Sequence, residues 1–352
     1  MAVDQPFGLD LVDFDRLTAW MDDEGIGAGP IEHVTPLTGG SQNIIVRFQR
    51  GGRDYVLRRP PLHPSADGNR TMLREARVLG ALAESDVPHP RLIGVSGDEA
   101  VLGAAFYLME PVEGFNAGVG LPGLHAHDPA IRHRMGLAMA EGIARLSRVD
   151  WRSAGLEGFG NPEGFLERQV SRWRGQLDSY ARHDGWPGAA TLPDIDALSL
   201  WLERNRPITS IPGIMHGDYH LKNVMFRHDG PELAAIIDWE LATIGDPMLD
   251  LGWLLATWRD QGAPASEAQI VVEPWIGFPS PSELVEHYKD VSGRDVSRAG
   301  WYAVLACYKL AILLEGTYAR ACAGKAPCEI GERMHSSAIR LLKKAGRFAA
   351  EG

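Results

Sequence analysis

The spacing of hydrophobic residues changes from a strand-like to a helix-like period along the chain. Residues 31–36, 43–50 and 54–59 are short runs rich in β-branched and aromatic residues, a pattern typical of strands. Glycine-containing segments at 38–41 and 51–52 separate these runs, and glycine suits the tight turns of hairpins. The first third of the chain therefore predicts an antiparallel sheet.

A helix and two further strands follow. Within residues 69–84, apolar side chains such as Met72 and Leu79 recur on one helical face, with charged residues on the other. Residues 92–95 and 105–109 are again short and apolar, which predicts strands. We expect all of these elements to belong to the same lobe as the sheet.

Helical periods dominate from residue 128 onward. The predicted helices cover residues 131–148, 162–180, 195–206, 249–258, 282–289, 297–323 and 333–348, and short strands are predicted at 214–215, 224–226 and 234–237. This order predicts an α+β protein with two lobes, a small antiparallel-sheet lobe and a larger, mostly helical one. We place the first lobe, with a leading helix, at residues 1–110, a connector at 111–115 and the helical lobe at 116–352.

Composition narrows the class of protein. The 352 residues are 45% hydrophobic and 23% charged, as expected for a globular protein. The longest apolar run, residues 301–314, contains Lys309 and is shorter than the roughly 18 residues of a membrane span, so we predict a buried helix and no membrane partner. A formal net charge of −11 argues against nucleic acid as a partner.

Two features predict a cytoplasmic protein. The first 15 residues have no basic run before an apolar stretch and so do not resemble a targeting peptide. Cys307, Cys322 and Cys328 are odd in number and lack paired spacing, which suits reduced thiols.

The strongest chemical signal lies at residues 216–226, which read H-G-D-Y-H-L-K-N-V-M-F. Asp218 precedes Asn223 by five positions, and a second predicted strand then leads to Asp238. Two carboxylates and a carboxamide can thus converge from two loops. Hard oxygen ligands of this kind suit Mg²⁺, which prefers carboxylates together with phosphate oxygens.

This pattern resembles the kinase catalytic loop H-R-D-x-x-x-x-N, with Gly217 in place of arginine, and Asp238 stands where kinases carry the D-F-G aspartate. The form H-G-D-x-x-x-x-N followed by I-D-W is similar to the aminoglycoside phosphotransferase and choline kinase superfamily. The resemblance implies a protein-kinase-like fold. It also implies ATP and Mg²⁺ as cofactors, Asp218 as the group that accepts the substrate hydroxyl proton, and Asn223 and Asp238 as metal ligands.

Three upstream segments fit the same resemblance. Gly39, Gly40 and Ser41 lie in the first predicted turn and could place backbone N–H groups over phosphates, although a plain hairpin would contain the same residues. Arg58 aligns with the usual kinase lysine, and its guanidinium can contact phosphate with Glu75 of the next helix as its partner. A solvated helix charge is the alternative for Glu75.

The last upstream segment is F-Y-L-M-E-P-V at residues 106–112, which resembles the hinge strand of kinases. By that resemblance Glu110 and Val112 would contact adenine through their backbone. His216 is predicted to brace the catalytic loop, and Asp250 has the same predicted role. Residues 239–250 leave no room for a protein-kinase activation segment, which favours a small-molecule hydroxyl acceptor.

Within the superfamily, L-R-R-P-P, F-Y-L-M-E and D-W-E-L-A-T-I-G-D-P are most similar to the branch that includes the kinase-like domain of acyl-CoA dehydrogenase fusion proteins. That branch suggests a hydroxyacyl-CoA or another hydroxylated metabolite, whereas the superfamily name suggests an aminoglycoside. Both acceptors stay open.

Three other readings of these residues also stay open. A catalytically silent nucleotide-binding module is one, and a scaffold that binds no nucleotide is another. The third takes His216 and His220 as a zinc pair with Asp218, which Gly217 and the missing H-E-x-x-H glutamate disfavour.

Overall fold

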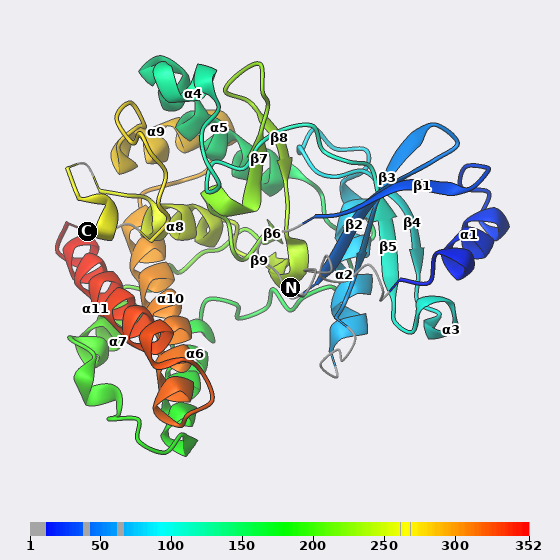
Figure 1. Ribbon diagram of the computed structural model, residues 1–352. Helices are drawn as coiled ribbons and strands as arrows, with labels where there is room; N and C mark the ends of the chain where they lie inside the picture. The colour runs from blue at the N-terminus through cyan, green and yellow to red at the C-terminus, as the bar shows by residue number, and fades with distance from the viewer. Residues whose placement is uncertain (1–11, 38–42, 62–66, 261, 268, 352) are drawn as a thin grey trace, which may run out of the picture. The chain divides into compact units, whose positions relative to one another are not determined.

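The computed structural model describes residues 12–37, 43–61, 67–260, 262–267 and 269–351. The chain divides into two compact units, whose elements are labelled in Figure 1. Unit 1 comprises Met1–Glu113, Arg152–Leu156 and Ala234–Ala242, and unit 2 comprises Gly114–Trp151, Glu157–Leu233 and Thr243–Gly352. Asp238 therefore belongs to unit 1 although the segments on either side of it belong to unit 2.

Unit 1 is built on a five-stranded antiparallel sheet in the order β1-β2-β3-β5-β4. Its elements in chain order are α1 (Phe14–Asp23), β1 (Ile31–Pro36), β2 (Ile44–Arg50), β3 (Arg53–Arg59), α2 (Gly68–Leu82), β4 (Leu92–Ser96), α3 (Glu99–Leu102) and β5 (Phe106–Met109). The turn between β2 and β3 is formed by Gly51 and Gly52, both with positive φ, as a two-residue hairpin loop requires.

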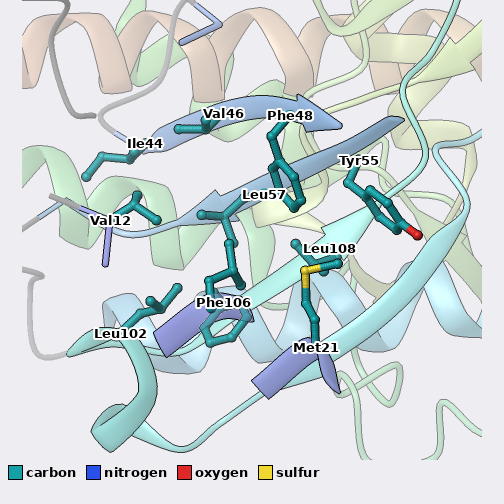
Figure 2. Packing of buried hydrophobic residues seen from close by; sticks show 11 residues of the cluster. Val12, Met21, Ile44, Val46, Phe48, Tyr55, Leu57, Leu102, Phe106 and Leu108 are labelled. Atoms are coloured by element: carbon teal, nitrogen blue, oxygen red, sulfur yellow. The ribbon is translucent and has the colours of Figure 1, made fainter. Parts of the chain in front are cut away.

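One face of this sheet carries the core of unit 1. Figure 2 shows Leu57 of β3 and Leu108 of β5 packed with Met21 of α1. The full cluster is Val12, Leu17, Met21, Ile44, Val46, Phe48, Tyr55, Leu57, Leu102, Phe106 and Leu108. Because successive strand residues point to opposite faces, Arg58 and Tyr107, which are register partners, lie on the other face, toward α2.

Unit 2 is mostly helical. Its helices and strands are α4 (Gly123–His127), α5 (Pro129–Arg148), α6 (Gln169–Asp178), α7 (Ile195–Arg204), β6 (Gly213–Met215), β7 (Val224–Phe226), β9 (Thr243–Gly245), α8 (Met248–Thr257), α9 (Pro281–Ser292), α10 (Ala299–Cys322) and α11 (Cys328–Glu351). β6 and β9 form an antiparallel pair. β8 (Leu233–Ile236) leads from unit 2 into the segment that carries Asp238.

The long apolar helix predicted around residues 301–314 is α10, which packs against α6, α7, α8 and α11 (Figure 1). Among the described residues it is the helix long and apolar enough to cross a membrane, and 72% of its most apolar window is buried within the protein. The prediction of a buried helix is confirmed. The length argument was wrong, because it counted only residues 301–314, whereas this 24-residue helix contains a window of 18 residues that is apolar enough to span a membrane.

The predicted fold class is confirmed, and most predicted elements lie within a few residues of those observed. α6 begins at Gln169 rather than near residue 162 because turns occupy residues 163–168, where Gly164 has a φ of +56°. The sequence reading missed α3, α4 and β9, which have only three to five residues each. Elements this short carry too few residues to display a period.

Close helix packing in unit 2 gives a test of the fold. A Cβ at Gly252 of α8 would lie 2.4 Å from the backbone oxygen of Tyr302 in α10. Gly252→Ala should therefore lower the free energy of unfolding by about 1–3 kcal/mol, the usual effect of overpacking. Gly175→Ala in α6 is the matched control, since nothing lies within 4 Å and alanine favours a helix by about 1 kcal/mol. Chemical denaturation should give opposite signs, and equal signs would contradict the packing.

Candidate active site

In unit 1, Arg58 lies between two carboxylates. Its Nε is 3.1 Å from Oε2 of Glu75 on α2, and its Nη2 donates a 2.7 Å hydrogen bond to Oδ1 of Asp238. Tyr107 donates from its hydroxyl to the same Oε2 of Glu75 at 3.0 Å. The pairing of Arg58 with Glu75 is the one that the sequence predicted, so Glu75 is not a solvated helix charge.

Burial sets the electrostatics of this group. Arg58, Glu75 and Tyr107 are all buried. Loss of hydration raises the pKa of Glu75 to about 7, against the opposing attraction of Arg58 and the hydrogen bond from Tyr107. Burial opposes the charge of Arg58 as well, but Glu75 and Asp238 outweigh it and raise the pKa of the guanidinium. Arg58 is therefore a permanent cation held in a protein interior.

Asp238 lies at the end of the β8 segment with its backbone in the left-handed region, at φ +66° and ψ +65°. Aspartate tolerates this region better than most residues, yet it is uncommon outside glycine and is often found at functional sites. The segment is fixed on both sides. Ile236 donates its N–H to the Pro88 carbonyl at 2.8 Å, and Arg74 of α2 donates to the Ala242 carbonyl at 3.1 Å.

In unit 2, the loop that carries Asp218 is organised by Asp250 of α8. The Asp250 carboxylate accepts the backbone N–H groups of His216 at 2.7 Å and of Gly217 at 2.8 Å. The ring of His216 accepts the N–H of Asp218 through Nδ1 at 3.3 Å. Gly217 has a φ of +86°, which explains why glycine replaces the kinase arginine here. Asp250 and His216 are thus the loop braces that the sequence predicted.

The carboxylate of Asp218 is held at both oxygens. Oδ1 accepts the indole N–H of Trp253 at 2.8 Å, and Oδ2 accepts the amide Nδ2 of Asn223 at 3.0 Å. Nδ2 of Asn223 also donates to the backbone oxygen of Asp218 at 2.9 Å. Because the amide nitrogen is engaged in this way, the Oδ1 of Asn223 is the atom that can bind a cation.

Trp253 and Lys309 are the two residues of this site that the sequence reading missed. Lys309 of α10 donates to the Gly217 carbonyl at 3.3 Å, and its ammonium lies 4.4 Å from the centroid of the Trp253 ring. Burial lowers the pKa of Lys309 to about 8, although Asp250 and Asp218 attract its charge. Neither residue belongs to the motif, and a lysine within an apolar run is the one signal that could have drawn attention to α10.

The zinc reading finds no support. Within the ranges that the structure describes, no group of three or more His, Cys, Asp and Glu side chains is placed to share a metal ion. The ring of His216 is buried and faces the backbone of its own loop, and His220 lies 3.4 Å from Asp218. The side-chain oxygen of Asn223 is a ligand type that suits a harder cation.

The remaining candidate residues fall into two sets. Gly39, Gly40 and Ser41 lie outside the described residues. Glu110 donates its N–H to the Arg91 carbonyl at 2.9 Å and pairs through its side chain with Arg53 at 2.5 Å. Val112 lies two residues further on, next to the last residue of this part of unit 1. Contact of Glu110 and Val112 with adenine stays a prediction.

Strand register also separates Arg58 from its neighbour. Arg59 points to the opposite face of β3 and donates to the Leu102 carbonyl at 2.8 Å. Arg59 therefore anchors α3, and Arg58 is the arginine on the face that carries Glu75.

The sequence of this chain matches a phosphotransferase family and part of several longer proteins. The model of the phosphotransferase enzyme family APH matches residues 33–274. Acyl-CoA dehydrogenase family member 11 of Pongo abelii is 32% identical over 286 residues, which is 80% of this chain and 35% of that protein. The chain thus spans about a third of the length of the curated relatives it matches.

Solved structures agree with the fold. A candidate aminoglycoside phosphotransferase from Ralstonia eutropha superposes with a TM-score of 0.78 at 29% identity, covering 96% of this chain and 99% of that one. An aminoglycoside phosphotransferase of type APH(4)-Ia, solved with ADP and hygromycin B, gives a TM-score of 0.54 at 15% identity over 92% and 97% of the two chains. The second likeness concerns the fold alone.

The bracing of the loop by Asp250 can be tested by Asp250→Asn. The amide keeps the shape and one oxygen, but its NH₂ group faces the backbone donor of either His216 or Gly217, and a buried donor left without an acceptor is unfavourable by about 1–3 kcal/mol. We expect the free energy of unfolding to fall by that amount in chemical denaturation. Asp229→Asn, in an exposed pair with Arg227, is the control and should change it by less than about 0.5 kcal/mol.

Proposed function

The chain belongs to the APH phosphotransferase enzyme family, and on that premise we propose that it transfers the γ-phosphate of ATP to the hydroxyl of a small molecule. Family membership supports the class of reaction. The chain matches only about a third of the length of these relatives, so their complete activities are not carried over. The proposal rests instead on the residues of this chain.

The observation that carries it is the arrangement around Asp218. A general base must hold a carboxylate oxygen in a fixed position near the proton it accepts. Trp253 and Asn223 each donate to one oxygen of Asp218, so the carboxylate cannot rotate freely. Each oxygen still has a second lone pair, and one of these can accept the hydroxyl proton of the acceptor.

The donor set also fits the proposed cofactor. Asn223 and Asp238 would hold Mg²⁺ through oxygen atoms, the ligand type that this ion prefers. When bound, Mg²⁺ neutralises charge on the β- and γ-phosphates. Arg58 would contact phosphate oxygens with the forked donors of its guanidinium, which now point partly at Asp238.

The proposed reaction requires no covalent intermediate. The acceptor oxygen forms a bond to the γ-phosphorus, the bond from that phosphorus to the β–γ bridging oxygen breaks, and the acceptor proton passes to Asp218. Phosphoryl transfer has a loose transition state, so positioning and charge neutralisation provide most of the rate enhancement. This is consistent with a site in which hydrogen bonds fix the loop, cations neutralise charge, and Asp218 is the carboxylate that accepts the proton.

Nucleotide binding provides the first test. ATP with Mg²⁺ should raise the thermal unfolding temperature of the full chain, and ATP with a chelator should raise it less. Arg58→Ala should weaken ATP binding about tenfold or more, because a charge-assisted contact to phosphate contributes about 1.5–3 kcal/mol. Arg58→Lys should restore part of the affinity, and Arg70→Ala, which changes an exposed residue of α2, should have no effect.

Two outcomes would count against the proposal. One is an unfolding temperature that does not respond to ATP and Mg²⁺, as expected of a scaffold. The other is ATP affinity that is equal in wild type and Arg58→Ala, which would remove Arg58 from the nucleotide site.

The roles of Asp218 and Asp238 should separate kinetically. Asp218→Asn removes the proton acceptor, so turnover should fall about 10²-fold or more while nucleotide affinity persists. Asp238→Asn removes a metal ligand, so raising Mg²⁺ should partly restore its activity. Steady-state rates across a Mg²⁺ titration measure both, with slow ATP hydrolysis as the reaction until an acceptor is identified. Rescue of Asp218→Asn by Mg²⁺, without rescue of Asp238→Asn, would reverse the two assignments.

A further inference from the structure

A cavity of about 440 Å³ opens in unit 2 between α6, the turn that follows it, and α10. Three arginines and one histidine line it, namely Arg172, Arg182, Arg320 and His183. Trp173 is among its aromatic and apolar lining residues, and none of the described residues that line the cavity is acidic. The molecule as a whole has a net charge of −11, so this concentration of positive charge is not a property of the general surface.

The arginines that line the cavity are not paired with carboxylates of the described residues. Arg172, Arg182 and Arg320 form no ion pair within the part of the chain that the structure describes, whereas nearby Arg174 pairs with Asp178 and Asp196. Arg320 donates to the Thr317 hydroxyl at 2.9 Å, and Arg172 lies over the ring of Trp173. Guanidinium groups that converge on a cavity without carboxylate partners are suited to bind an anion.

The cavity is linked to the support of Asp218 through side-chain contacts. The ammonium of Lys309 lies 5.3 Å from the ring centroid of Trp173, which lines the cavity, and 4.4 Å from that of Trp253, which donates to Asp218. The cavity then extends along α10, away from Lys309, past Leu313 to Arg320. The seven-residue separation between Leu313 and Arg320 corresponds to about 10 Å of helix.

We propose that this cavity binds the anionic end, a phosphate ester or a carboxylate, of an extended acceptor whose hydroxyl group is phosphorylated at Asp218. This rests on the phosphotransferase function proposed above and names the class of its acceptor. Arg172 and Arg320 bind the anion, and Leu313 and the aromatic lining contact the middle of the molecule. A polycation such as an aminoglycoside is disfavoured, because its ammonium groups would meet unpaired arginines.

Binding of matched probes to the full chain tests the proposal without requiring turnover. Hydroxyhexyl phosphate, hydroxyhexanoate and aminohexanol have the same chain and hydroxyl but end in phosphate, carboxylate or ammonium. Calorimetric titrations with saturating ADP and Mg²⁺ should show binding of one or both anions and none of aminohexanol. Arg172→Gln with Arg320→Gln should weaken anion binding about tenfold or more, since a hydrogen bond to a charged group contributes about 1.5–3 kcal/mol.

The same experiment compares the phosphate with the carboxylate probe and includes a control variant. Preference between hydroxyhexyl phosphate and hydroxyhexanoate identifies the anion. Arg227→Gln removes an exposed arginine that is paired with Asp229 in unit 2, and it should bind the probes as the wild type does.

The proposal is overturned if aminohexanol binds as well as the anions, if no anion binds, or if the double variant and the wild type bind equally. ADP binding, measured separately, reports on the phosphotransferase function. Absence of ADP binding would defeat that function, while the response of anion binding to Arg172 and Arg320 would still decide whether the cavity is an anion site.

Discussion

Several elements of unit 1 depend on the pairing of Arg58, a permanent cation. Arg58 is buried, and a buried charge is tolerated only when it is paired and hydrogen-bonded. Glu75 from α2 and Asp238 from the β8 segment supply the pairing, so one guanidinium joins the central strand of the sheet to a helix and to a loop 180 residues away in sequence. A neutral residue at position 58 would leave two carboxylates close together, one of them fully buried. The same contacts place a metal-ligand candidate and a phosphate-binding candidate side by side within unit 1.

In unit 2 the candidate site depends on a buried carboxylate rather than on a buried cation. Asp250 accepts two consecutive backbone N–H groups and so fixes the turn that presents Asp218, while Gly217 supplies the left-handed conformation that the turn needs. Trp253 lies three residues further along the same helix and therefore on nearly the same face. Helix α8 thus fixes the loop through Asp250 and orients the carboxylate of Asp218 through Trp253. The ammonium of Lys309 in α10 lies over the ring of Trp253. The position of Asp218, the proposed base, is therefore set by contacts with helices and not by the loop alone.

Much of this could be predicted from the sequence because its signals are local. The resemblance to kinases selected Arg58 with Glu75 as its partner, and the spacing of Asp218, Asn223 and Asp238 predicted the candidate catalytic motif. The indole bond of Trp253 and the contact of Lys309 could not be predicted, since both depend on how α8 and α10 pack. For the same reason Arg172, Arg182 and Arg320 carry no motif: they meet only when α6 lies beside α10.

The two sets of arginines differ in a way that bears on function. Arg58 and Arg59 lie within the protein, where Arg58 pairs with Glu75 and Asp238 and Arg59 donates to the Leu102 carbonyl. The cavity arginines are exposed, so water satisfies them and the fold gains nothing from their convergence. Like charges brought together repel one another, and this repulsion is relieved when an anion binds among them. The cavity arginines therefore differ from Arg58, whose proposed phosphate contact is made by a guanidinium that the fold already pairs with Glu75 and Asp238.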